Sequence, residues 1–357
     1  MGIRKTMSYL IYGVNILVAI GLLFSYLTSY VSPESTVIFA FFGLGYPILL
    51  ILNLIFVIYW GIRKKRKVFL SIIILLLGCS HFFQFFQFPF NGEELIEGNS
   101  IKVMSYNVRL FDLYDWTKKD KVKEKILNLV NEQSPDVVCF QEYYMKGSPV
   151  VLSKILKMPY VHEYFSKTSL KQGKKAGVGT AIYSKYKIIN KGEVLFENEK
   201  SNHCTYVDIL KEEDTIRIYN AHLGSIRFDY DDYTFIAREK KQSIEEDMMP
   251  LKKIAKRLKL GFEKRVGQVN ELLEHIQESP YATIIGSDMN DTPISYSYEQ
   301  FSSVLMDSFN EKGNWTGSTY IGAIPLLRID YLWHNKKMIN TSFETIEKEY
   351  SDHRPII

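Results

Sequence analysis

The sequence has 357 residues, 46% of them hydrophobic, which is long enough for one large domain or two ordinary ones. The net charge of +4 is concentrated near the N-terminus, because residues 1–100 hold seven Lys or Arg against four Glu. The remainder carries 37 basic against 36 acidic residues, which excludes the global basic field that indicates a nucleic-acid-binding protein.

The chain begins with three apolar stretches that contain no charged residue. They run from Met7 to Tyr30, from Thr36 to Trp60 and from Val68 to about Phe86. Crossing a bilayer requires about 20 apolar residues, so we predict three transmembrane helices. A signal peptide would be shorter and single. We therefore expect a membrane domain over residues 1–88 and a linker over residues 89–99.

Basic residues predict the orientation of these helices, because Lys and Arg next to a span are retained on the cytoplasmic side. Arg4 and Lys5 precede the first stretch, and "RKKRK" (Arg63 to Lys67) separates the second from the third, whereas the intervening "VSPES" has no basic residue. We expect an integral protein of the plasma or inner membrane with everything after about Phe88 outside the cytoplasm. The basic cluster can also bind anionic lipid head groups.

From Ser100 onward the pattern is that of a globular domain. "IKVMSYNV" predicts a strand, "KVKEKILNLVNEQ" an amphipathic helix, and "PDVVCFQE" a buried strand. Further strands are predicted in "GVGTAIYSKYKII", "CTYVDIL", "TIRIYNAHL", "YATIIGSDMN", "LRIDYLWHN" and "SFETIEKEY". Many strands with a few helices between them predict an α/β fold of two packed sheets with helices outside.

Polar residues occur where these predicted strands end or in the motifs that follow them. They are Asn107, Glu142, His222, Asp288, Asn290, Asp330, Asp352 and His353. Taken singly, an Asn or Asp after a strand is usually a turn residue, Glu142 can be a solvated strand end, and His222 a hydrogen-bonded core histidine. Gathered at one rim of a sheet, they would form a metal and phosphate site.

Six motifs carry a resemblance to a known family. "MSYNVR", "DVVCFQE", "NAHL", "IGSDMND", "RIDYLW" and "SDHRP", in this order, resemble the successive motifs of the endonuclease/exonuclease/phosphatase superfamily. The resemblance covers residues 100–357 and implies a catalytic domain with the DNase I-like, four-layered α/β sandwich. It also implies cleavage of phosphate esters with Mg²⁺, or with Mn²⁺ as the alternative ion.

The resemblance also implies roles for individual residues. Glu142 would be the principal metal ligand, with Asn107 and Asp352 nearby, a set of hard oxygen ligands that suits Mg²⁺. His353 would be the general base or a phosphate-contacting imidazole, oriented by Asp330.

Four further residues would complete the site. Asp288 would position the attacking water, Asn290 would hold a phosphate oxygen, and His222 would stabilise charge or assist the leaving group. Arg109, two residues after Asn107, would grip a phosphate or be a salt-bridged surface residue.

A long insertion separates "NAHL" from "YATII". Within it, residues 251–276 predict an amphipathic helix with an apolar stripe and a basic opposite face. We interpret it as a helix of the fold with a solvated face, or as a lid or surface that meets anionic lipid. The acidic and aromatic segment at residues 227–235 would belong to the same access loop.

Two enzyme hypotheses and one non-enzyme hypothesis follow. The favoured one is a membrane-anchored phosphoesterase that acts on a phosphorylated lipid head group at a phospholipid membrane. An extracytoplasmic DNase I-like endonuclease is the alternative, although the near-neutral domain disfavours a nucleic-acid partner. A catalytically inactive scaffold carries the least weight, because every recognisable catalytic position is filled.

Overall fold

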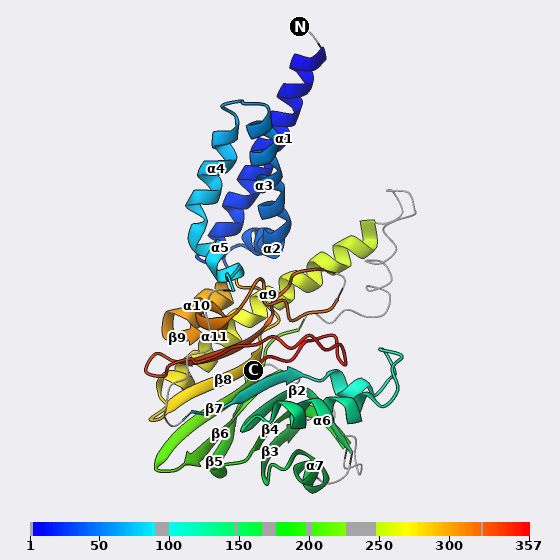
Figure 1. Ribbon diagram of the computed structural model, residues 1–357, viewed down its shortest axis with the longest axis vertical. Helices are drawn as coiled ribbons and strands as arrows, with labels where there is room; N and C mark the ends of the chain where they lie inside the picture. Colours follow the sequence, from blue (N-terminus) through cyan, green and yellow to red (C-terminus); the bar gives the residue numbers. More distant parts are fainter. Residues whose placement is uncertain are drawn as a thin grey trace.

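The computed structural model describes residues 3–89, 100–146, 149–165, 176–197, 202–225, 248–322 and 324–357. Figure 1 shows a slender helical unit standing on a larger α/β domain. The predicted linker lies almost entirely outside the described residues, as does the 227–235 segment. The helical unit consists of α1 (Ile3–Leu27), α2 (Ile38–Leu44), α3 (Tyr46–Ile62), α4 (Val68–Leu77) and α5 (Cys79–Phe85).

One helix of this unit, over Lys5–Leu27, is long and apolar enough to cross a membrane. The second and third predicted spans are bent, by 66° between α2 and α3 and by 67° between α4 and α5. The described residues therefore contain one such helix, or up to three if each bent pair is a single span. The bend at Gly78 lies against α1, because a Cβ there would overlap the ring of Tyr26.

The α/β domain contains two mixed sheets. The first has the order β1-β2-β4-β3, with β1 parallel to β2, and comprises β1 (Val103–Asn107), β2 (Val137–Lys146), β3 (Tyr160–Phe165) and β4 (Ala176–Ser184). The second has the order β5-β6-β7-β8-β10-β9, with β7 parallel to β8. Its strands are β5 (Lys187–Val194), β6 (His203–Lys211), β7 (Asp214–His222), β8 (Ala282–Asp288), β9 (Leu305–Asp307) and β10 (Asp330–Asn335).

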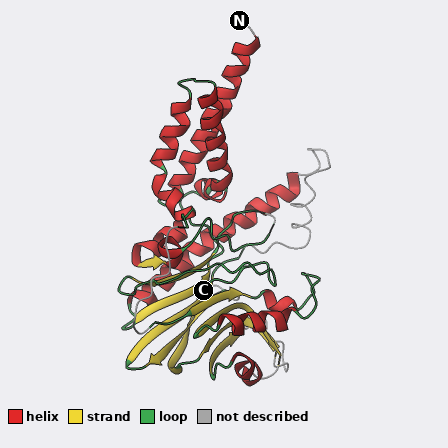
Figure 2. Cartoon of the chain, viewed as in Figure 1, coloured by secondary structure: helices red, strands yellow, loops and turns green. Residues whose placement is uncertain are grey.

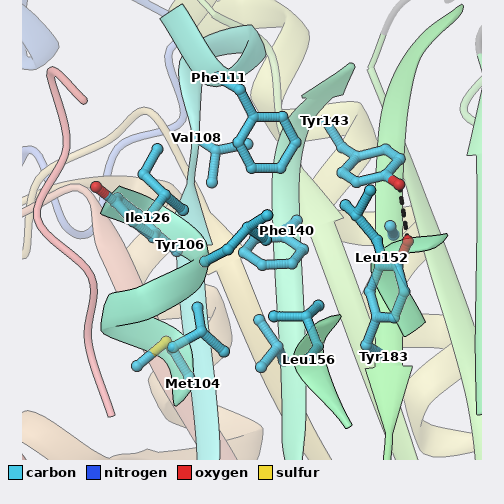
Figure 3. Packing of buried hydrophobic residues seen from close by; sticks show 14 of the residues in the cluster. Met104, Tyr106, Val108, Phe111, Ile126, Phe140, Tyr143, Leu152, Leu156 and Tyr183 are labelled. Atoms are coloured by element: carbon cyan, nitrogen blue, oxygen red, sulfur yellow. Dashed lines mark hydrogen bonds between the residues drawn. The ribbon is translucent and has the colours of Figure 1, made fainter. Parts of the chain in front are cut away.

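Helices cover the outer face of each sheet, as Figure 2 shows. A cluster of apolar residues including Cys139, Ile182 and Ile218 fills the space between the sheets. In Figure 3, Phe140 lies among side chains of the first sheet and of the helices α6 (Val122–Gln133) and α7 (Pro149–Leu156). A third cluster joins the second sheet to α9 (Met248–Gln277) and α10 (Tyr296–Val304). The layers confirm the DNase I-like α/β sandwich.

Three details of the predicted strands were wrong. The run "GVGTAIYSKYKII" turns at Lys185 and Tyr186, so that β4 joins the first sheet and β5 the second. The run "SFETIEKEY" is not a strand and contributes a single bridge, from Thr345 to Ile356. Neither β3 nor β9 was predicted, because short or half-buried strands have weak alternation.

The predicted basic helix is α9, and it belongs to the fold. Its apolar stripe is largely buried, including Phe262, Val266, Val269 and Ile276. Lys252, Lys253, Lys256 and Lys259 of its first half are exposed. The helix therefore has a packed face and a basic solvated face.

Candidate active site

The strand directions bring most of the predicted residues to one rim. Asn107, His222 and Asp288 are the last residues of β1, β7 and β8. Because β7 is parallel to β8, His222 and Asp288 lie next to each other in register. Asp330 is the first residue of β10, which runs antiparallel to β8 and places Asp330 opposite Asp288 in register. A strand that begins at a rim can therefore deliver a side chain to the same place as strands that end there.

Glu142 reaches the site differently from the prediction, because β2 does not end there but continues to Lys146. The pairing of β2 with β4 shifts register between Phe140 and Tyr143, and Glu142 has a φ of 45°. A bulge of this kind re-aims one side chain out of the alternating pattern. Oε1 of Glu142 lies 3.7 Å from Nε2 of His222.

His353 is hydrogen-bonded to Asp330 and lies near Asp288. Its Nδ1 lies 2.8 Å from Oδ2 of Asp330, and its Nε2 lies 4.0 Å from Oδ2 of Asp288. Burial opposes protonation of His353, yet the carboxylates of Asp330 and Asp288 outweigh it and raise the pKa of the imidazole. The structure thus brings His353 and Asp330 into contact, as the sequence suggested.

Asn107 and Asp288 are joined by a hydrogen bond between the two sheets. The side-chain amide of Asn107 donates to Oδ2 of Asp288 at 2.8 Å, and its Oδ1 accepts from the backbone N–H of Arg109. The backbone N–H of Asn290 donates to the other oxygen of Asp288 at 2.9 Å. Asp288 is therefore held on both sides, with Asn290 beside it.

His222 has an unused polar atom. Its Nε2 is buried, lies 3.7 Å from both Glu142 and Asp288, and has no hydrogen-bond partner among the described residues. An unpaired buried nitrogen costs free energy unless a ligand or water satisfies it. The atom is thus available for a phosphate oxygen or a leaving group.

Arg109 is tied to the site rather than lying free on the surface. Its Nε lies 3.2 Å from Oδ2 of Asp352, and its guanidinium lies over the ring of Trp116 at 4.5 Å. Sequence reasoning missed Trp116, because a contact between an exposed loop aromatic and an arginine has no sequence signal. It also missed Ser351, whose Oγ donates to the backbone oxygen of Asn107 at 2.8 Å.

The acidic cluster has the donor types that a divalent cation needs. Burial raises the pKa of Glu142, and the nearby carboxylates of Asp352 and Asp288 raise it further. His222 and His353 lower the pKa, but their effect is smaller. A cation beside Glu142, Asn107 and Asp352 would relieve this repulsion through oxygen ligands.

Asp288, Asp330 and His353 also present ligand atoms within 4.8 Å of one another. The Asp330–His353 hydrogen bond already occupies two of those atoms. The oxygen ligands of Glu142, Asn107 and Asp352 therefore fit a hard cation better than this second group does.

The carboxylates, amides and histidines at this rim can neutralise charge on a phosphate ester, and the chain is a hydrolase of phosphate esters. Residues 104–353 match the Endonuclease/Exonuclease/phosphatase family, and residues 8–85 match a domain of unknown function (DUF8431). The chain therefore belongs to the endonuclease/exonuclease/phosphatase family, whose members depend on a divalent metal. No curated protein matches the chain.

Several solved structures of low sequence identity are similar to this chain. A family protein from Beutenbergia cavernae is 15% identical, with a TM-score of 0.50 and coverage of 72% of this chain and 70% of that one. A family protein from Leptotrichia buccalis is 19% identical, with a TM-score of 0.49 and coverage of 72% and 98%. The mannosyl-6-phosphatase of Bacteroides thetaiotaomicron is 16% identical, with a TM-score of 0.47 and coverage of 72% and 98%.

Proposed function

We propose that this chain is a membrane-anchored, Mg²⁺-dependent phosphoesterase that hydrolyses a phosphate ester of a phosphorylated lipid head group, with its catalytic domain outside the cytoplasm. One observation carries the choice of a lipid. The helical unit, whose outer surface is apolar, packs directly on the catalytic domain next to the segment that bears Asn290.

The surface of the helical unit supports insertion into a bilayer. Its helices expose large aliphatic side chains that a soluble protein would bury, among them Leu10, Leu17, Ile48, Ile58, Leu76 and Leu77. The exposed lysines of α9 lie on a helix that contacts this unit, because Phe262 packs edge-on against Phe41 of α2 at 5.6 Å. A basic stripe next to an apolar unit suits a surface of anionic head groups.

The arrangement of charge supports the extracytoplasmic orientation. Figure 1 shows the α3–α4 connection and the N-terminal end of α1 on the side of the helical unit away from the catalytic domain. That end carries the basic segment Arg63–Lys67, which is expected to stay in the cytoplasm. The catalytic domain would then lie across the membrane. If a reporter that is active only in the cytoplasm were active when fused after residue 90, this orientation would be wrong.

Each residue of the site has a proposed role in the reaction. The metal would be held by Glu142, Asn107 and Asp352, with Mn²⁺ as the alternative ion; when bound, it would neutralise charge on the phosphate. His353, oriented by Asp330, would accept a proton from water that Asp288 positions.

Charge on the phosphate needs further partners on the protein. Asn290 and Arg109 would contact phosphate oxygens, and the unpaired Nε2 of His222 would stabilise charge near the leaving group.

The test is release of phosphate or head group from a panel of phospholipid vesicles by the full-length protein with Mg²⁺. His353→Ala is the control, and plasmid DNA is assayed in parallel. Lipid turnover that the mutant loses would support the proposal. DNA nicking that falls steeply with added salt, with lipids untouched, would instead establish a tethered nuclease.

A further inference from the structure

A loop leads from the catalytic rim into the core of the helical unit. The 290–295 loop begins two residues after Asp288, and its Ile294 is 1% exposed. Ile294 belongs to the apolar cluster that otherwise consists of residues of the helical unit and Leu326. The buried members that come from the helical unit are Leu22, Tyr26, Tyr46, Leu50 and Phe85. The catalytic domain thus contributes a side chain to the core of the other unit.

Gly43 of α2 lies directly against the backbone of the loop. A Cβ at this position would lie 2.6 Å from the backbone oxygen of Ile294 and 2.7 Å from Cγ2 of Thr28. The Thr28 side chain is buried and its Oγ1 donates to the backbone oxygen of Phe39, and the backbone oxygen of Ile294 moves only if the loop moves. The loop therefore seats fully only against a glycine.

A second connection ends at the other catalytic strand. Arg328, two residues before Asp330, is 1% exposed and donates from Nη1 to Oδ2 of Asp307 at 2.7 Å. Its Nη2 donates to the backbone oxygen of Gln84 in the last turn of α5 at 2.9 Å. Because carbonyls in the last turn of a helix lack partners within the helix, Arg328 satisfies one of them.

Residues of the catalytic domain also bind the 290–295 loop. Nε of Arg265, a fully buried residue of α9, lies 3.0 Å from Oδ2 of Asp291. Nη1 of Arg265 donates to the backbone oxygen of Gly224, two residues after His222. The hydroxyl of Tyr331 donates to the backbone oxygen of Asp291 at 2.9 Å. The loop is held between the catalytic rim and the helical unit.

We propose that the helical unit is a positioning element of the catalytic site, and not a tether alone. Through Ile294 it holds the loop that begins with Asn290, and through Gln84 it holds the segment that leads into Asp330. Displacement of a catalytic group by about 1 Å can reduce the rate roughly 100-fold, so these contacts affect the chemical step. The kinetic part of this inference rests on the proposed function, whereas the structural part does not.

The experiment compares two glycine-to-alanine variants of the full-length protein in detergent micelles. Gly43→Ala places a methyl group against the loop, whereas Gly61→Ala in α3 is the matched control, because a Cβ there meets nothing within 4 Å. Hydrogen exchange followed by mass spectrometry reports on the amides of Asn290 and Asp330, which donate to Asp288 and Thr319. Hydrolysis of bis(p-nitrophenyl) phosphate with Mg²⁺ is measured on the same samples.

We expect Gly43→Ala to speed exchange of these two amides and to lower kcat about tenfold or more, with KM changed less than about threefold. Gly61→Ala should match the wild type. Ile294→Ala should act like Gly43→Ala, and its matched control is Ile339→Ala, at a position 73% exposed on the catalytic domain.

If Gly43→Ala leaves exchange at Asn290 and Asp330 unchanged, or raises exchange uniformly along the chain, the inference is wrong. The interface would then contribute to stability without positioning the site. The inference is also wrong if the wild type is active and both Gly43→Ala and Ile294→Ala keep the wild-type kcat. If the wild type hydrolyses no phosphate ester, the proposed function fails, and the exchange data alone decide whether the helical unit positions the loop.

Discussion

Asp330 and Asp288 lie opposite each other in register on β10 and β8, and His353 lies between them, 2.8 Å from one carboxylate and 4.0 Å from the other. If Nδ1 of His353 donates to Asp330, Nε2 is left as the atom that can accept a proton. The antiparallel pairing of two strands thus places one imidazole between two carboxylates, hydrogen-bonded to Asp330 and within 4.0 Å of Asp288.

Asp330→Asn tests this arrangement. An amide no longer favours the tautomer or the charged form of His353, so we expect kcat to fall roughly 100-fold or more with KM little changed. Steady-state kinetics with a soluble phosphodiester and Mg²⁺ measure the effect. Asp214→Asn, at the exposed first residue of β7, is the control. Equal activity of the two variants would remove Asp330 from the mechanism.

Glu142→Gln tests the metal site. Loss of the anionic oxygen should weaken Mn²⁺ binding, followed by electron paramagnetic resonance, by at least about tenfold. It should also abolish the activity that EDTA removes and Mg²⁺ restores in the wild type. Glu213→Gln, at an exposed turn position, should bind Mn²⁺ as the wild type does. Unaltered Mn²⁺ affinity in Glu142→Gln would place the cation elsewhere.

Arg265→Met tests the buried ion pair beneath the 290–295 loop. Arg265 is fully buried and the Asp291 side chain is 8% exposed, so removal of the guanidinium leaves a carboxylate without its charged partner. We expect a loss of about 3–5 kcal/mol in the free energy of unfolding. The double variant Arg265→Met, Asp291→Leu should recover much of it, as measured by thermal unfolding. A double variant no more stable than the single one would contradict this account.

His334 predicts a pH dependence of stability away from the catalytic site. Burial lowers its pKa, but the 2.6 Å contact with Glu311 outweighs burial, and the folded-state pKa is raised. The stabilisation is therefore fully present below the unfolded-state value of about 6.5 and is lost as pH rises through the folded-state value.

His334→Gln should remove this dependence. The difference in Tm between the wild type and His334→Gln should be largest below about pH 6.5 and shrink as the pH rises above it. A difference that is constant across this range would show that the Glu311 contact is not ionic.

The family, the α/β class and most residues of the rim could be predicted from the amino-acid sequence. Buried strands have a strong apolar pattern, and the polar residues that follow them stand out against it, as Asn107, His222 and Asp288 do. The motif order then predicted that Glu142 and His353 belong to the same site. The strand patterns and the single motifs are local signals, carried by residues within a few positions of one another, and the order of the motifs adds a signal that runs along the whole domain.

The contacts that hold the site together could not be predicted from the sequence. The bulge that aims Glu142, the bond from Asn107 to Asp288 across 181 residues and the insertion of Ile294 among the helices all join distant segments. A contact between residues far apart in the sequence depends on sheet order and packing, which no local pattern contains. For the same reason, the sequence indicated an apolar N-terminal region, but only the packing against Gly43 and Gln84 placed it next to the catalytic rim.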